Sequence, residues 1–192
     1  RTESAPPPAA GISKTATATV HAESPDANLL AVGAAAPPFT LRDQSNQPVD
    51  AAELWKKAPL VLYFYPADFT PGCTQEAHAF EEVRPQLEAL GAHLVAISVN
   101  AVPSHSRFAE HCGTHFPMLA DTSATVANLY GTALTLQQEH GTRTIARRVT
   151  YLIAAGGLVR DRWVVSDPLT HPTDVLRAVE ALRSAGQPMK HE

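Results

Sequence analysis

The sequence lacks the features that mark several common protein classes. Its 192 residues include only two cysteines, Cys73 and Cys112, which excludes a scaffold built on several disulfides. No apolar run approaches the ~18 residues of a membrane-spanning helix. Acidic residues outnumber basic ones, the formal net charge is −4, and no basic patch indicates nucleic-acid binding. Two cysteines suit a redox pair or a lone catalytic thiol, and the residues around each cysteine bear on which of these applies.

The first 38 residues contain no phenylalanine, tyrosine or tryptophan and are rich in alanine, proline, threonine and serine. Such a segment buries too little apolar area to offset the entropy lost on ordering. We therefore predict a disordered linker over residues 1–30 and one folded domain over residues 31–188. Because the chain begins at Arg1, we expect a bacterial protein exported to the periplasm after signal removal. A removed organelle transit peptide, a trimmed chain or a cytoplasmic protein remain alternatives.

Cys73 lies where a buried strand is predicted to pass into a helix. Leu60–Tyr65 is continuously apolar, as in a strand covered on both faces, and 74–90 has helical periodicity. Thr70 is a suitable N-cap and Pro71 suits the first helical position. Cys73 then lies in the first helical turn, where the helix dipole favours the nucleophilic thiolate. Buried packing is the ordinary alternative for a cysteine, but the stiff, glycine-containing loop before it favours a binding pocket.

This pattern resembles a known family. Pro66-x-x-x-Thr70-x-x-Cys73 is similar to the signature of the peroxiredoxins, in the AhpC/TSA superfamily, and the longer run 61–77 resembles their bacterioferritin comigratory protein/PrxQ branch. Two further segments, 116–121 and 147–153, are similar to other stretches of that branch. The resemblance covers about residues 33 to 185. It implies an α/β, thioredoxin-like fold with a central mixed sheet flanked by helices on both faces.

The order of predicted elements agrees with that fold. Strands alternate with helices and are followed by a hairpin and a last helix, which favours a mixed sheet covered on both faces. Pro85 is expected to kink the helix near Glu81 or to break it. The segment 133–144 has no confident interpretation. The predicted strands are 38–42, 60–65, 93–99, 118–120, 148–154 and 158–165, and the predicted helices are 51–56, 74–90, 104–111, 123–130 and 172–183.

The resemblance also implies roles for four residues. Cys73 would attack a peroxide as a thiolate and become a sulfenic acid. Thr70 would hydrogen-bond the peroxide, and Arg148, rather than Arg147, would stabilise the charge that moves to the leaving oxygen. Pro66 would shield the sulfur from water. The expected substrates are hydrogen peroxide and organic hydroperoxides, the reductant is thioredoxin or another thiol, no cofactor or metal is needed, and the enzyme is expected to be a monomer.

The chain departs from many relatives at the second cysteine. Where they carry a cysteine five residues after the first, this chain has His78, which cannot form a disulfide. The remaining thiol, Cys112, lies near the end of the helix predicted over 104–111, with Gly113 as a suitable C-terminal residue. Cys112 is therefore either a displaced resolving cysteine or a buried structural thiol in a one-cysteine enzyme. A disulfide would require the helical turns around both residues to unwind.

Three other hypotheses compete with that of a peroxidase. A disulfide oxidoreductase of this fold needs Cys-x-x-Cys, but Glu76 stands at the position of the second cysteine. A copper chaperone needs Cys-x-x-x-Cys, but Ala77 stands at the position of its second cysteine. A redox sensor without turnover, or a metal site near Cys112, is the other alternative. The nearby histidines His105, His111 and His115 fit no standard zinc spacing. The other histidines are scattered and predicted to lie on the surface.

Overall fold

The computed structural model describes residues 26–186. Within them, one mixed sheet has the strand order β2-β1-β5-β4-β3-β8-β9. β3 and β5 flank β4 in parallel, whereas β8 pairs with β3 in the antiparallel sense. The strands are β1 Thr40–Arg42, β2 Pro48–Asp50, β3 Leu60–Phe64, β4 His93–Ser98, β5 Met118–Ala120, β8 Val149–Ile153 and β9 Val159–Val164.

The central strand β3 divides the core into two layers. Successive side chains of a strand point to opposite faces, and every residue of β3 is buried. Leu60, Leu62 and Phe64 belong to one apolar cluster and Val61 and Tyr63 to the other. A strand buried on both faces must be covered by helices on both sides, which explains why its sequence is continuously apolar.

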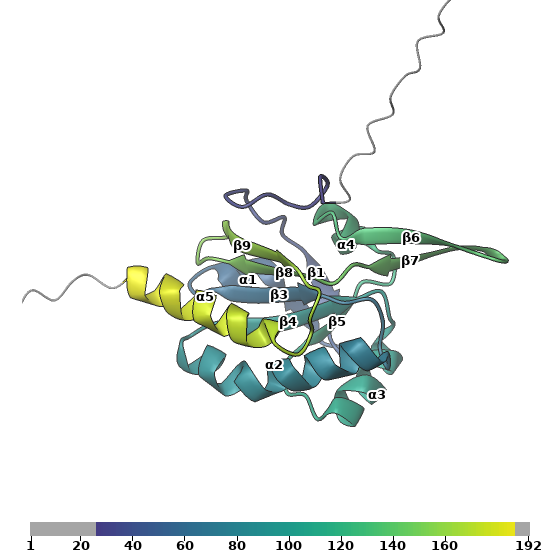
Figure 1. Cartoon of the computed structure of the whole chain (residues 1–192), viewed down its shortest axis with the longest axis horizontal. Coiled ribbons are helices and arrows are strands. Elements are labelled where there is room, and N and C mark those ends of the chain that lie inside the picture. The colour runs from purple at the N-terminus through teal and green to yellow at the C-terminus, as the bar shows by residue number, and fades with distance from the viewer. Residues whose placement is uncertain (1–25, 187–192) are drawn as a thin grey trace, which may run out of the picture.

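The helices cover both faces as that requirement predicts (Figure 1). α1 and α4 pack in the layer of Leu62, and α2, α3 and α5 pack in the layer of Tyr63. The predicted mixed sheet with helices on both faces is therefore confirmed. The helices are α1 Ala51–Trp55, α2 Pro71–Ala89, α3 Val102–Cys112, α4 Thr125–Leu129 and α5 His171–Ala185.

The structure decides two local points that the sequence left open. α2 continues through Pro85 without the alternative break, with Phe80 and Leu87 fully buried on either side of the proline. The uninterpreted segment forms a separate two-stranded hairpin, β6 Ala133–Gln138 and β7 Gly141–Ala146, which projects from the body (Figure 1). Most residues of this hairpin are exposed, so its strands carry little of the apolar alternation that reveals a half-buried strand.

Most of the segment predicted to be a linker, residues 1–25, lies outside the described residues. The last five residues of that segment, 26–30, are packed against the domain. Leu29 is buried in the layer of Leu62, and the backbone N–H of Leu30 lies 3.3 Å from the Tyr130 carbonyl oxygen and donates to it. No helix within residues 26–186 is long and apolar enough to cross a membrane.

Candidate active site

The loop after β3 and the first turn of α2 together position Cys73. Thr70 is extended (φ −78°, ψ 148°), and its Oγ1 accepts a hydrogen bond from the Cys73 backbone N–H at 3.4 Å. Pro71 follows as the first helical residue, where its missing N–H leaves no helical bond unmade. Cys73 therefore lies in the first turn, as the sequence predicts, and its side chain is buried.

Sheet register brings Arg148 to the sulfur. Val149, the first residue of β8, pairs with Phe64 at the end of β3, so the residue before it lies beside the loop that leads to Cys73. Nη2 of Arg148 donates to Cys73 Sγ at 3.2 Å. A Cβ on Gly72 would lie 3.1 Å from the same nitrogen, so a residue without a side chain leaves the guanidinium room.

The neighbouring Arg147 points elsewhere. Its Nη2 lies 2.5 Å from Asp26 Oδ1, in the packed segment at the start of the described chain. Adjacent residues at a strand start project in opposite directions, so only one of the two arginines reaches the sulfur. The structure places Arg148 there.

Glu76 completes the charged group and was not foreseen as a site residue. Its side chain is fully buried, its Oε2 accepts from Arg148 Nη1, and its Oε1 is buried without a hydrogen-bond partner. The guanidinium thus bridges Cys73 and Glu76. A sequence signal exists: residues three apart share a helix face, so a glutamate three positions after Cys73 on an otherwise apolar face needs a cationic partner.

The electrostatics of this pair follow from burial. Burial raises the pKa of Glu76 to about 7, although Arg148 acts to lower it. Burial acts to lower the pKa of Arg148, but the charges of Glu76 and Cys73 outweigh it and hold that pKa above its usual value. Arg148 therefore stays charged, while Glu76 changes its charge near neutral pH.

Thr70 and Pro66 lie in the loop that precedes α2. The Thr70 hydroxyl donates to the Ala67 carbonyl oxygen at 3.2 Å while it accepts from Cys73. A hydroxyl has a single hydrogen, so Thr70 must turn away from Ala67 before it can donate to a bound molecule. Pro66 is partly exposed at the start of the same loop. Phe69 adopts a left-handed conformation (φ 62°) and leaves about half of its surface exposed (49%).

Cys112 shares the core layer of Cys73 but forms no disulfide with it. Both thiols are free and buried, and both belong to the cluster around Tyr63. Burial, with a smaller effect of Asp68, raises the pKa of Cys112 to about 11. Cys112 ends α3, and Gly113 follows at the helix end, as predicted, in the left-handed conformation (φ 63°). His78 is exposed on α2.

The three histidines near Cys112 are separated in space. His105 is buried against Asp68, His115 pairs with Glu81, and the His111 ring lies 5.7 Å from the Phe69 ring. Among residues 26–186, no group of three or more histidine, cysteine and acidic side chains is placed to hold a metal ion.

His171 corrects the prediction that the scattered histidines lie on the surface. It is buried at the start of α5, and its Nε2 lies 2.8 Å from Thr150 Oγ1. Burial lowers the pKa of His171 to about 4, with Asp174 acting to raise it and Arg148 to lower it. His171 is therefore neutral near pH 7.

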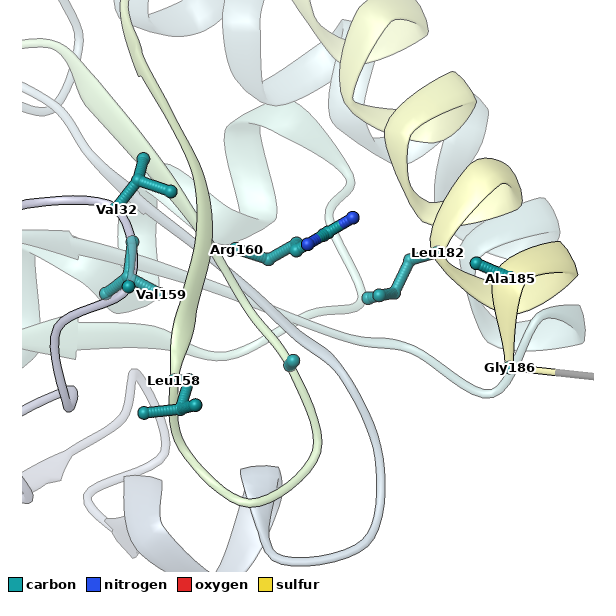
Figure 2. Close-up of a pocket in the computed structure, with 9 residues that line it drawn as sticks. Val32, Leu158, Val159, Arg160, Leu182, Ala185 and Gly186 are labelled. Carbon is teal, nitrogen blue, oxygen red and sulfur yellow. The ribbon is translucent and has the colours of Figure 1, made fainter.

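The cavity drawn in Figure 2 lies far from Cys73. Val32, Leu158 and Arg160 line it on one side, and Leu182 and Ala185 of α5 on the other. His171, whose Nε2 lies 2.8 Å from Thr150 Oγ1, two residues after Arg148, is eleven residues before Leu182 on the same helix, or about 16 Å at 1.5 Å per residue. This cavity therefore belongs to the opposite end of α5 and is not part of the site around Cys73.

Comparison with known proteins gives consistent matches. The family model described as "AhpC/TSA family" matches residues 32–162. Peroxiredoxin Q from Sedum lineare, a chloroplastic protein, is 34% identical over 152 residues, which cover 79% of this chain and 78% of that protein. The crystal structure of peroxidoxin BcpB from Mycobacterium tuberculosis has 30% identity and a TM-score of 0.72, covering 79% of this chain and 97% of that one.

A third match is the bacterioferritin comigratory protein of Xanthomonas campestris. It has 26% identity and a TM-score of 0.69, and the alignment covers 76% of this chain and 92% of that one. Its structures are described in connection with alkyl peroxide reduction. These solved structures confirm the predicted thioredoxin-like fold.

Proposed function

Because this chain belongs to the AhpC/TSA family and is a thiol peroxidase of the peroxiredoxin Q/bacterioferritin comigratory protein type, we propose that Cys73 is its peroxidatic cysteine. The observation that carries the proposal is the 3.2 Å contact between Arg148 Nη2 and the buried Cys73 Sγ. The contact lies at the positive end of α2. A fixed cation and a helix N-terminus both favour a thiolate, which is the nucleophilic form of cysteine.

In the first step, the Cys73 thiolate attacks the terminal oxygen of a hydroperoxide. The S–O bond forms as the O–O bond breaks, so the sulfur is oxidised to a sulfenic acid and the peroxide is reduced to an alcohol or water. The leaving oxygen carries the negative charge and takes a proton from water. Arg148 stabilises that charge, and Thr70, once turned away from Ala67, donates to the peroxide and aligns it.

In the second step, we propose that Cys112 resolves the sulfenic acid. Its thiol sulfur displaces the hydroxyl of the Cys73 sulfenic acid, which forms a disulfide and releases water. The two alpha carbons must come within ~5–6 Å, so the first turn of α2 and the last turn of α3 must open. The high pKa of Cys112, set by burial, makes it a poor nucleophile until that opening exposes it.

We propose hydrogen peroxide and organic hydroperoxides as substrates and a thiol such as thioredoxin as reductant. The relation to the Xanthomonas campestris protein, whose structures concern alkyl peroxide reduction, supports organic substrates. The exposed Phe69, whose ring packs against Phe108 of α3, offers an apolar surface in the loop before Cys73. The external thiol reduces the Cys73–Cys112 disulfide and is itself oxidised to a disulfide. We propose a monomer as the working unit.

The experiment that tests this function is intact-mass analysis after one equivalent of hydrogen peroxide, with peptide mapping under non-reducing conditions. We expect a loss of two hydrogens and a peptide that joins Cys73 to Cys112. A gain of one oxygen at Cys73, with Cys112 still a free thiol, would retain the peroxidatic role but overturn the resolving role. Oxidation that spares Cys73 would overturn both.

Glu76 should impose a pH dependence on the first step. Above its pKa of about 7, which burial has raised, the Glu76 carboxylate holds Arg148 in place; below it, the protonated acid holds it less firmly. The rate constant of the thiolate with hydrogen peroxide is therefore expected to rise several-fold as pH increases through about 7. Stopped-flow rates, divided by the thiolate fraction from absorbance near 240 nm, measure it.

The matched variants are Glu76→Gln and Glu88→Gln. The first removes the ionisation from the site, so the corrected rate should no longer change near pH 7. Glu88 is exposed on the same helix and pairs only with Arg84 among the described residues, so its variant should keep the wild-type profile. An unchanged profile in Glu76→Gln would assign the pH dependence to another group.

A further inference from the structure

A second buried charged cluster lies on the α3 side of the active-site loop. It consists of Tyr65, Asp68, Ser104 and His105, and we call it the latch. The His105 side chain is fully buried and the Asp68 side chain is 1% exposed. Burying a carboxylate and an imidazole is costly unless each is paired and hydrogen-bonded. The peroxide step as described uses neither residue, so their presence in an apolar layer requires another explanation.

Asp68 is the centre of the latch. Its Oδ1 accepts from the Tyr65 hydroxyl at 2.6 Å, and its Oδ2 accepts from the Ser104 hydroxyl at 2.6 Å. His105 Nδ1 lies 3.1 Å from Oδ1 and 3.0 Å from Oδ2. Burial acts to raise the pKa of Asp68, but the hydrogen bonds and charge of His105, with those of Ser104 and Tyr65, hold it below its usual value. Asp68 is therefore ionised.

The partners of His105 determine where its protons lie. Its Nε2 is 3.1 Å from the Leu119 carbonyl oxygen, which can only accept, so Nε2 carries a hydrogen. Its Nδ1 faces the ionised Asp68 carboxylate, which also only accepts. Nδ1 is therefore also placed to donate, and the centre of the latch is the buried pair of His105 and Asp68.

The latch joins the two segments that carry the cysteines. Asp68 lies in the loop between β3 and α2, five residues before Cys73. Its backbone N–H also donates to Asn100 Oδ1 at 3.1 Å, just before α3. His105 lies in the first turns of α3, seven residues before Cys112, and residues seven apart share a helix face. One buried ion pair thus ties the active-site loop to the helix of the proposed resolving cysteine.

We propose that Asp68 and His105 are positioning residues that hold this loop against α3 and thereby limit how often Cys112 is exposed for disulfide formation. The inference rests on the proposed function, because it concerns the step in which the Cys112 sulfur displaces the Cys73 hydroxyl as water. With the latch closed, Thr70 and Cys73 stay ordered for the peroxide step. With it broken, the loop and α3 separate more often.

Two other titratable side chains lie close to this pair. They are Tyr65 after β3, whose hydroxyl lies 3.2 Å from His105 Nδ1, and Cys112 of α3, whose pKa is raised by burial and, to a smaller extent, by the Asp68 charge. Both are uncharged at neutral pH, since burial raises the pKa of each. The contact between Asp68 and His105 is therefore the charged link between the loop and α3.

The test is the rate at which Cys112 reacts with an excess of dithiodipyridine in the full chain carrying Cys73→Ser. Cys112 is buried, so it reacts in proportion to the open population. We expect His105→Gln and Asp68→Asn each to accelerate labelling at pH 6 by at least about tenfold, because removing one partner of a buried ion pair costs more than the ~1.4 kcal/mol of a tenfold change. Their combination should add little.

The double variant separates positioning from packing. If the two residues act through their contact with each other, adding Asp68→Asn to His105→Gln should change the labelling rate little further. His93→Gln, at an exposed site on β4, is the control and should label like the parent. Single-variant rates close to that of the parent, or two effects that multiply in the double variant, would overturn the proposal.

Two further measurements keep the result decisive. Circular dichroism and Tm verify folding, and if His105→Gln does not fold, Ser104→Ala, which removes one hydrogen bond to Asp68, should show the same change with a smaller amplitude. The labelling assay needs neither peroxide nor turnover, so it stands even if Cys73 proves not to be peroxidatic. In the two-cysteine chain, the same variants should form the Cys73–Cys112 disulfide faster after peroxide.

Discussion

Replacing Cys73 with serine is expected to abolish peroxide turnover. The variant would keep nearly the same volume at a site that is 2% exposed, so the fold should survive. It would lose the sulfur atom that takes an oxygen from the peroxide and that a second thiol then reduces, because a serine hydroxyl forms no sulfenic acid. Consumption of hydrogen peroxide with thioredoxin or dithiothreitol as reductant should fall to the background of the thiol alone.

The matched control for that substitution is Cys112→Ser. It removes the other thiol of the same core layer, so it tests whether any buried cysteine would serve. We expect it to react with the first equivalent of peroxide at the wild-type rate but to accumulate the Cys73 sulfenic acid, which dimedone would trap. Retained turnover in Cys73→Ser, or loss of the first reaction in Cys112→Ser, would reverse the assignment of the two cysteines.

The position of Cys73 could be predicted from the sequence because its determinants are local. An apolar strand, a threonine N-cap and a proline at the first helical position lie within a few residues of it. The hairpin of β8 and β9 is likewise encoded by two apolar runs around a glycine pair. The resemblance to peroxiredoxins then selected Arg148 over its neighbour, a choice that the register of β8 against β3 explains.

The charged partners could not be predicted in the same way because they are distant in sequence. Glu76 meets Arg148 across 72 residues, and Asp68 meets His105 across 37. These pairings depend on which strands are neighbours and on how α3 packs against the loop. The hydrophobic periodicity of the sequence indicates neither. Local reasoning also left open whether Pro85 breaks the helix, since proline removes one helical hydrogen bond. The burial of Phe80 and Leu87 holds the helix on both sides of it.

Replacing Arg148 with alanine should slow the reaction of Cys73 with hydrogen peroxide by about 10²-fold or more. Two losses combine. The sulfur loses the cation that lies 3.2 Å away and favours its thiolate, and the leaving oxygen loses the group that would take up its charge as the O–O bond breaks. The rate constant can be followed in a single turnover by intrinsic fluorescence or by competition with a peroxidase of known rate.

Arg148→Ala also leaves the buried Glu76 carboxylate without its cationic partner, so an effect on folding must be separated from an effect on the reaction. A buried carboxylate that loses its cation destabilises the fold, by roughly 3–5 kcal/mol for a fully buried pair, unless it takes up a proton. Adding Glu76→Gln removes that charge. The double variant should therefore recover much of the stability lost in Arg148→Ala while remaining as slow with peroxide, which stability and rate measurements on the same samples would show.

Arg147→Ala is the matched control for the loss of an arginine at this strand. Arg147 bonds Asp26 rather than the sulfur, so the single-turnover rate should stay within about twofold of wild type, within the range of an interaction made away from the reacting atoms. Arg148→Lys should restore only part of the rate, because one ammonium cannot bridge Glu76 and Cys73 as the planar guanidinium does. An unchanged rate in Arg148→Ala would mean that the helix dipole and Thr70 suffice to activate Cys73, and the 3.2 Å contact would then be structural.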